Sequence, residues 1–228
     1  MKVLVIDVGG SKVKFAVPGT KRKGKFPSGK TLTPKQMLEQ LLRRVAKWRY
    51  DAVSIGYPGR VVKGRPAGEP PNLGPGWCNF NFRKAFQKPV KVMNDAAMQA
   101  LGSYKGGRML FIGLGSGVGS ALILDDIIVP LELGELTDGK GRKLVEVLGK
   151  KGLEERGLVR WRKSLHKVVR RLTAAFFTDY LVIGGGGVKW LSRLPAGARR
   201  GSNALAFVGG ARLWNSSIQH VQHTWIIA

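Results

Sequence analysis

The 228 residues, 43% of them hydrophobic, can build one large domain or two small lobes around a real core, which excludes general disorder. A single cysteine, Cys78, excludes an intramolecular disulfide and a zinc site made of several cysteines. The 39 lysines and arginines against 14 aspartates and glutamates give a net charge of +25, which favours a polyanionic partner (nucleic acid, an anionic membrane or a phosphate polymer) or is simply a solvated basic surface.

At the start of the chain, an apolar run covers residues 3–6 and is interrupted by Asp7. Four apolar residues are too few for the core of a signal peptide. No later apolar run approaches the ~18 residues that a transmembrane helix needs. We therefore expect a cytoplasmic protein without a membrane partner.

Residues 3–17 and 109–124 share one layout: an apolar run, a glycine-rich turn and a second β-rich run. Each predicts a β-hairpin whose turn uses glycine for positive φ and close backbone approach. Such a turn directs backbone N–H groups into one concavity that suits a phosphate, although either hairpin alone could be ordinary sheet. Two copies indicate a duplicated domain with a cleft between its halves. Asp7 in the first copy, where the second has Gly113, can position Mg²⁺ beside the phosphates.

The segments that follow the first hairpin predict a helix, a strand and a loop. Residues 34–49 repeat apolar side chains at helical spacing, and Thr33 and Pro34 provide a helix start. Residues 51–59 predict a strand that runs into a Gly-Pro loop, and residues 64–77 predict a long surface loop because they are rich in glycine and proline.

Residues 89–104 predict a short strand and then a helix, with Asn94 and Asp95 at the junction. Either side chain could simply cap the helix.

Farther along, residues 131–139 precede a basic region, in which residues 160–177 predict an amphipathic helix with basic residues largely off its apolar face.

The last third of the chain predicts one buried strand and two helices. Residues 180–191 read as a strand that breaks into four glycines before a helix, a junction that often receives a nucleotide or a phosphate. Residues 204–214 predict a second helix, which a polar tail follows.

In their order and spacing, these motifs resemble those of the ROK family of sugar kinases, and within it the polyphosphate glucokinase-like branch, over nearly the whole chain. The matching segments are DVGGSK (7–12) and GLGSGVG (113–119) for the two phosphate motifs, EPPNLGPGW (69–77) for the sugar loop, VMNDAAMQALGSY (92–104) for the catalytic segment, LELGEL (131–136) for the Glu-x-Gly-His sugar motif and IGGGG (183–187) for the nucleotide-side glycines.

The resemblance implies an α/β fold of the actin-like (ASKHA) sugar kinase type, in which two lobes, each with a five-stranded sheet, close on the substrate. We expect an N-terminal lobe over residues 1–105 and a C-terminal lobe over residues 106–228. The implied activity is that of a glucokinase, which transfers a phosphoryl group from polyphosphate and/or ATP to the 6-hydroxyl of glucose or another hexose, with Mg²⁺. A homodimer is the default expectation, without a specific nucleic-acid partner.

The resemblance also implies the roles of individual residues. Asp95 is the catalytic base, and a carboxylate suffices because proton transfer is late and the closed cleft is dry. The sugar would be bound by Asn72, Asn94, Asp95, Glu132 and the residue at position 135, here Glu135. The donor phosphates would be held by Gly9, Gly10, Ser11, Lys12, Gly115, Ser116 and Gly117, the nucleotide side by Gly184, Gly185 and Gly186, and Mg²⁺ by Asp7. Simpler interpretations exist for Glu132 (an exposed strand residue), Asn72 (a turn former) and Lys12 (a surface lysine).

Two departures from the family pattern matter. Many members carry a cysteine-rich zinc cluster, whereas this chain has only Cys78, so we expect no zinc. Glu135 stands where the family has histidine, and an ionised carboxylate accepts hydrogen bonds but cannot donate one to a sugar hydroxyl. Beside Glu132 it should either raise one carboxyl pKa or turn toward a basic neighbour such as Lys140, Arg142 or Lys143.

Four functions are compatible with the sequence. The first is a kinase that uses polyphosphate, bound by Lys12 and by basic residues of 140–171 such as Arg160, Lys163 and Lys167. The second is an ATP-dependent hexokinase of the same fold, and the third is a sugar-binding protein with weakened catalysis. The fourth, a sugar-responsive DNA-binding repressor, is disfavoured because the first phosphate motif begins at Asp7 and leaves no room for an N-terminal helix-turn-helix.

Overall fold

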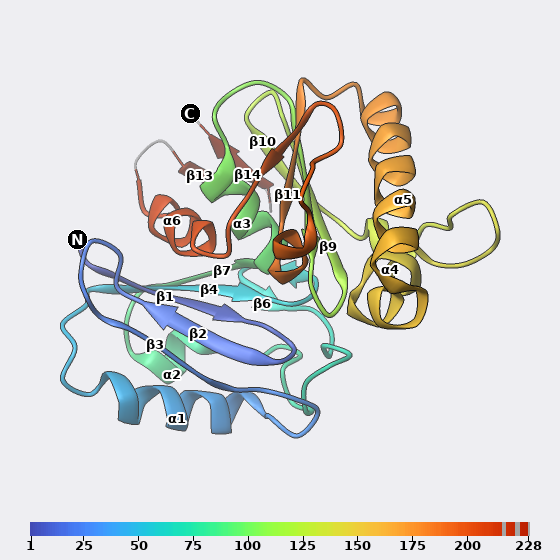
Figure 1. Ribbon diagram of the computed structural model, residues 1–228. Helices are drawn as coiled ribbons and strands as arrows, with labels where there is room; N and C mark the ends of the chain where they lie inside the picture. The colour runs from blue at the N-terminus through green and yellow to red at the C-terminus, as the bar shows by residue number, and fades with distance from the viewer. Residues whose placement is uncertain (216–217, 222–223, 228) are drawn as a thin grey trace.

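The first sheet carries the N-terminal hairpin and one helical layer. The structure, a computed structural model, describes all residues except 216–217, 222–223 and 228. The strand order in this sheet is β3-β2-β1-β4-β7, with the β1–β2 hairpin antiparallel and β1, β4 and β7 parallel (Figure 1). Its strands are β1 (Val3–Val8), β2 (Lys12–Ala16), β3 (Lys23–Pro27), β4 (Ala52–Tyr57) and β7 (Val90–Asn94).

The helix predicted over residues 34–49 is α1 (Pro34–Val45), which ends four residues earlier than expected and covers one face of this sheet. It begins with a capping box, because Thr33 Oγ1 accepts from the Gln36 amide at 3.3 Å and Gln36 Oε1 accepts from the Thr33 amide at 3.0 Å. Its buried side chains, among them Met37 and Leu41, pack in one core with alternate residues of β1. The short elements β5 (Val61–Val62), β6 (Arg65–Pro66) and α2 (Phe82–Phe86) complete this part.

The second sheet is larger than the family resemblance implied. Among the described residues it has seven strands, in the order β12-β11-β8-β9-β10-β14-β13. The expected polar tail was wrong, because β14 pairs with β10 on the side that β9 leaves open, and Trp225 of β14 is buried there. The strands are β8 (Met109–Leu114), β9 (Val118–Leu124), β10 (Ile127–Leu131), β11 (Tyr180–Gly184), β12 (Ala198–Arg200), β13 (Ile218–Val221) and β14 (Thr224–Ile227). The β8–β9 hairpin repeats the β1–β2 hairpin, so both predicted hairpins are confirmed.

Helices α3 (Asp95–Ser103) and α6 (Leu205–Arg212) lie between the two sheets (Figure 1). Helix α3 packs on β8 and β9, whereas α6 comes from the end of the chain and packs on β1 and β4. One core cluster therefore includes Val3 and Val5 together with residues of both helices and of the second sheet. The division into lobes at residues 105 and 106 stays a prediction: it separates the two sheets, but α6 returns to the first one.

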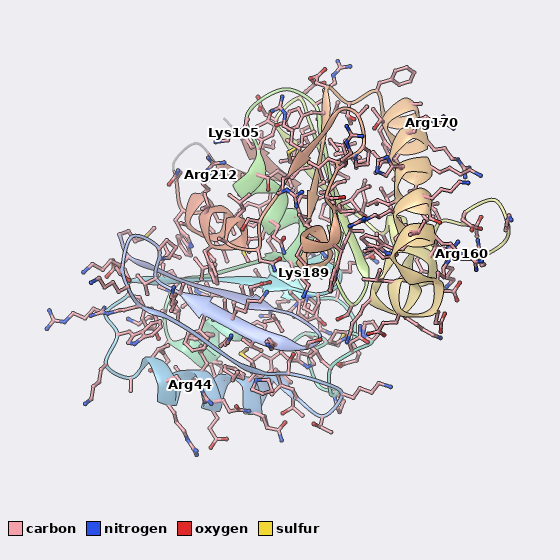
Figure 2. The ribbon with its side chains drawn as sticks, in the orientation of Figure 1. Arg44, Lys105, Arg160, Arg170, Lys189 and Arg212 are labelled. Carbon is pink, nitrogen blue, oxygen red and sulfur yellow. The ribbon has the colours of Figure 1, made fainter. Side chains whose placement is uncertain are left out.

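The helix α5 (Lys150–Phe176) covers the outer face of the second sheet, after η1 (Leu133–Glu135) and α4 (Leu144–Leu148). Gly157, with φ 73° and ψ 160°, interrupts it. Beyond that break, Trp161, Leu165, Val168 and Leu172 are buried, as the helical spacing predicted. Basic residues of α5, such as Arg160 and Arg170 in Figure 2, point outward. Within the described residues, no helix is long and apolar enough to cross a membrane.

Candidate active site

A cleft of about 780 Å³ lies where the two hairpin turns face each other. Both turns line it, and the hydroxyl oxygens Ser11 Oγ and Ser116 Oγ approach to 3.3 Å. The N-terminus of α3, the loop with Asn72 and the segment with Glu132 complete its wall. The sequence-predicted residues of all these motifs are therefore brought to one cavity.

The glycine turns are closed by their own backbone hydrogen bonds. The Gly9 amide donates to Lys12 O at 3.1 Å, and the Gly115 amide donates to Gly117 O at 3.0 Å. These two N–H groups are therefore occupied by the turns themselves. A phosphate cradle at this place would use the neighbouring groups of the two turns, which are Gly10, Ser11, Lys12, Ser116 and Gly117.

Asn94 and Asp95 stand at the junction of β7 and α3, and the structure separates their roles. Asn94 caps the helix, because its Oδ1 accepts from the Ala97 amide at 3.0 Å, and its Nδ2 donates to Gly59 O at 3.2 Å. Asp95 is the first helical residue, and its carboxylate accepts from the Ala96 amide at 2.8 Å. The capping interpretation thus holds for Asn94, and Asp95 lines the cleft.

The Asp95 carboxyl has an unusual affinity for protons. Burial raises its pKa to about 7, and the negative charges of Asp7 and Glu132 add to the shift, against the lowering effect of the hydrogen bond from the Ala96 amide. A carboxylate with a pKa near neutrality can accept a proton at physiological pH and release it again. This is the property that a general base needs.

Asp7 lies on β1 directly opposite Lys14 on β2. Its side chain is almost fully buried, and Lys14 Nζ donates to Asp7 Oδ2 at 3.1 Å. Both residues line the cleft. Lys14 is a site residue that the motif analysis missed, although the alternation of a strand puts residues 12 and 14 on the same face.

Glu132 and Glu135, the two neighbouring glutamates at η1, show the two effects expected of close carboxylates: a contact with a basic side chain and a raised pKa. Glu135 Oε2 accepts from Lys143 Nζ at 2.6 Å, which confirms the expected turn toward a basic neighbour. The pKa of Glu132 is raised, first by the loss of surrounding water at the cleft wall and then by the charge of Glu135. Both glutamates line the cleft.

The loop expected over residues 64–77 is anchored rather than loosely exposed. Its Trp77 is fully buried and donates through Nε1 to Leu32 O at 3.1 Å. The Glu69 carboxylate accepts from the amides of Trp77 and Cys78, both at 3.1 Å, and these bonds lower the Glu69 pKa. Asn72 is exposed in this loop beside Gly10, where an added Cβ would lie 3.0 Å from Asn72 Cβ.

The glycines after β11 approach the second turn closely. Gly185 has φ 80°, and a Cβ there would lie 2.3 Å from Leu114 O, so packing alone requires glycine. A Cβ on Gly186 would meet nothing within 4 Å, so packing does not explain this glycine. The helix predicted next is only a short 3₁₀ segment, η2 (Gly186–Trp190). Gly184, Gly185 and Gly186 as nucleotide-side residues therefore stay a prediction.

Three further cleft residues were not expected from the sequence. Lys150 and Lys189 reach the cleft from α5 and η2, and Figure 2 shows Lys189 near the middle of the molecule. Gln99, one turn after Asp95 on α3, has a buried Oε1 without a hydrogen-bond partner in the described part of the chain. Conversely, Arg160, Lys163 and Lys167 do not line the cleft.

Comparison with known proteins agrees with this geometry. The sequence model of the ROK family matches residues 3–130. A polyphosphate glucokinase of Mycobacterium leprae is 24% identical over 246 residues, which cover 94% of this chain and 75% of that protein.

Two solved structures extend the comparison. The inorganic polyphosphate/ATP-glucomannokinase of Arthrobacter sp. strain KM superposes with a TM-score of 0.79 at 25% identity, over 92% of this chain and 96% of that one. A ROK family glucokinase from Streptomyces griseus, in complex with glucose and AMPPNP, superposes with a TM-score of 0.67 at 18% identity, over 93% and 99%.

Proposed function

The chain belongs to the ROK family of sugar kinases and has their actin-like fold, and from this premise we propose that it phosphorylates the 6-hydroxyl of a hexose, glucose first, with polyphosphate and/or ATP as the donor. One observation carries the proposal: two glycine turns meet at Ser11 and Ser116 over a cleft whose wall holds Asp95. Phosphoryl transfer needs this combination of a phosphate cradle and a positioned base.

In the proposed reaction, the sugar lies between the Asn72 loop and the Glu132 segment, with its 6-hydroxyl at Asp95. Asp95 takes the hydroxyl proton as the sugar oxygen bonds to the phosphorus of the donor's terminal phosphoryl group. Asn94 is held by its hydrogen bonds to Ala97 and Gly59, so one amide hydrogen remains for a sugar hydroxyl. The two turns exclude water and hold the donor phosphates.

The proposed Mg²⁺ at Asp7 meets a difficulty in the residues around it. Among the described residues, no group of three or more His, Cys, Asp or Glu side chains could hold a metal ion, and Asp7 already pairs with Lys14. A Mg²⁺ ion held by the protein alone does not fit this set. In kinases Mg²⁺ usually binds the donor phosphates and keeps several waters.

Positive charge favours polyphosphate as a donor. Lys12, Lys150 and Lys189 line the cleft, and the net charge of the chain is +25. The outward residues of α5 lie outside the cleft, so they would contact only the distal part of a long polymer. ATP remains the second candidate, and the open space at Gly186 is the observation that favours it.

Glucose 6-phosphate formation with polyphosphate and with ATP, measured side by side, tests the proposal. We expect the KM for polyphosphate to rise roughly tenfold or more between ~50 and ~200 mM salt, because about three neutralised phosphates release their counterions. The KM for ATP should change much less. Use of ATP alone would overturn the choice of polymer, and no product with either donor would favour a sugar-binding protein without turnover.

Replacing Glu135 by histidine should tighten glucose binding about twofold to tenfold, because histidine restores a hydrogen-bond donor to the sugar. The effect should raise kcat/KM more than kcat. Titration calorimetry with glucose measures it, and Glu155→His, an exposed α5 residue that does not line the cleft, is the control for the charge change. Equal or weaker glucose binding by Glu135→His would mean that Glu135 serves a different substrate or none.

A further inference from the structure

Lys14 reaches the cleft because of the alternation along β2. Val13 and Phe15 point into the core under α1, whereas Lys12 and Lys14 line the cleft. Across the hairpin, Asp7 is the Cα partner of Lys14, and their side chains meet at 3.1 Å. The Asp7 side chain is 5% exposed and that of Lys14 is 33% exposed, so the pair is sheltered but open to the cleft.

The pair lies in an acidic part of a basic protein. Asp7 and Glu132 both act on Asp95 through their charge. In the described part of the chain, the ion pair with Lys14 is the sole salt bridge made by these three carboxylates. An incoming donor phosphate would be repelled by the carboxylates unless a cation offset them.

We propose that Lys14 is the resident cation of the phosphate site: Asp7 holds the Lys14 ammonium group where the donor phosphates enter, and this ammonium group occupies the Asp7 carboxylate in place of a divalent cation. The inference rests on the proposed kinase function for its catalytic part. The occupation of Asp7 by Lys14 rests only on the geometry of the pair, in which Lys14 Nζ lies 3.1 Å from Asp7 Oδ2.

The charge of Lys14 has a defined use in the transfer. The bond between the phosphorus and the bridging oxygen of the donor breaks, and the bridging oxygen keeps the electron pair. The new bond joins that phosphorus to the sugar oxygen, whose proton passes to Asp95. Negative charge shifts among the phosphoryl oxygens during this exchange. An ammonium group that is already held in place stabilises this charge without having to move.

Binding of Mn²⁺ alone to the protein, followed by electron paramagnetic resonance of the free ion, tests without any turnover whether Lys14 occupies the Asp7 carboxylate. Lys14→Met removes the ammonium group at similar length, and Lys14→Arg keeps the charge. Lys25→Met is the matched control, because Lys25 is the Cα partner of Lys14 on β3, is exposed and does not line the cleft. We expect Mn²⁺ affinity to rise at least about fivefold in Lys14→Met and to stay unchanged in the other two variants.

Steady-state kinetics test the catalytic part. We expect kcat/KM for the donor to fall roughly 30-fold in Lys14→Met, as for loss of a charge-assisted contact, and to recover in part at high Mg²⁺ and in Lys14→Arg. Equal Mn²⁺ affinity in wild type and Lys14→Met, or no Mn²⁺ binding by either protein, would overturn the idea that Lys14 keeps a divalent cation from Asp7. Full activity of Lys14→Met at low Mg²⁺ would overturn the role in transfer. If the wild type has no kinase activity with either donor, the proposed function fails, while the Mn²⁺ measurement still decides whether Lys14 occupies Asp7.

Discussion

Asp95→Asn is expected to lower kcat roughly a hundredfold or more while the protein stays folded. An asparagine has the same shape, and its Oδ1 can still accept the hydrogen bond from the Ala96 amide, which Asp95 accepts at 2.8 Å. The amide cannot take a proton from the sugar hydroxyl. The loss should therefore fall on turnover, with glucose affinity changed little.

The measurement needs a control for removing one negative charge. Asp125→Asn provides it, because Asp125 is an exposed residue of the β9–β10 turn at positive φ, a conformation that asparagine tolerates. This variant should retain wild-type kcat. If folded Asp95→Asn also turned over glucose at nearly the wild-type rate, Asp95 would have no part in proton transfer.

The pH dependence follows from the same residue. Burial raises the pKa of Asp95 to about 7, so the proposed base is protonated below that pH, and kcat/KM should rise as pH passes through 7. Stability should respond in the opposite direction. Between the ordinary carboxyl pKa and 7 the folded state binds more protons than the unfolded state, so the free energy of unfolding falls as pH rises through this window. Asp95→Asn should remove this fall and be the more thermostable protein at pH 8.

The parts of the fold that depend on local patterns were predictable. The two hairpins repeat one arrangement of apolar runs and glycines, and the start of α1 follows from Thr33 and Pro34. The last strands were not predictable, because β14 is stabilised by pairing with β10, more than 90 residues earlier in the chain. A polar-looking segment can become a strand when a sheet edge is available, and the edge is a property of the tertiary structure.

The candidate site divides in the same way. The order of the motifs predicted that Asp7, Ser11, Asp95 and Ser116 form one site, and in the structure all four line one cleft. Lys150 and Lys189 could not be found, because each is one lysine among many until the fold brings it to the cleft. Likewise, the sequence offered Lys143 only as one of several possible basic partners of Glu135. The turn between the two residues brings Lys143, and not the others, to the Glu135 carboxylate.

The second large effect is expected at the contact of α3 and α6. These helices cross at Gly102 and Gly209 with their backbones touching: a Cβ on Gly209 would lie 1.8 Å from Met98 O, and one on Gly102 would lie 1.9 Å from Leu205 O. Backbone atoms cannot yield as a flexible side chain can. Gly209→Val should therefore separate the helices and destabilise the protein by about 3 kcal/mol or more, at the upper end of overpacking costs.

A loss of this size would lower Tm by roughly 10 °C for a chain of this length, which thermal unfolding followed by circular dichroism can measure. Gly68→Ala is the control, because a Cβ at Gly68 meets nothing within 4 Å and its φ is ordinary, so its Tm should stay near that of the wild type. Wild-type stability of Gly209→Val would contradict the close crossing.

The same variant should lose activity even where it folds, because α6 rests on β1 and β4 while α3 begins at Asp95. A helix pair that is pushed apart moves the proposed base away from the turn that carries Ser11, and the base and the phosphate cradle then no longer meet at one sugar hydroxyl.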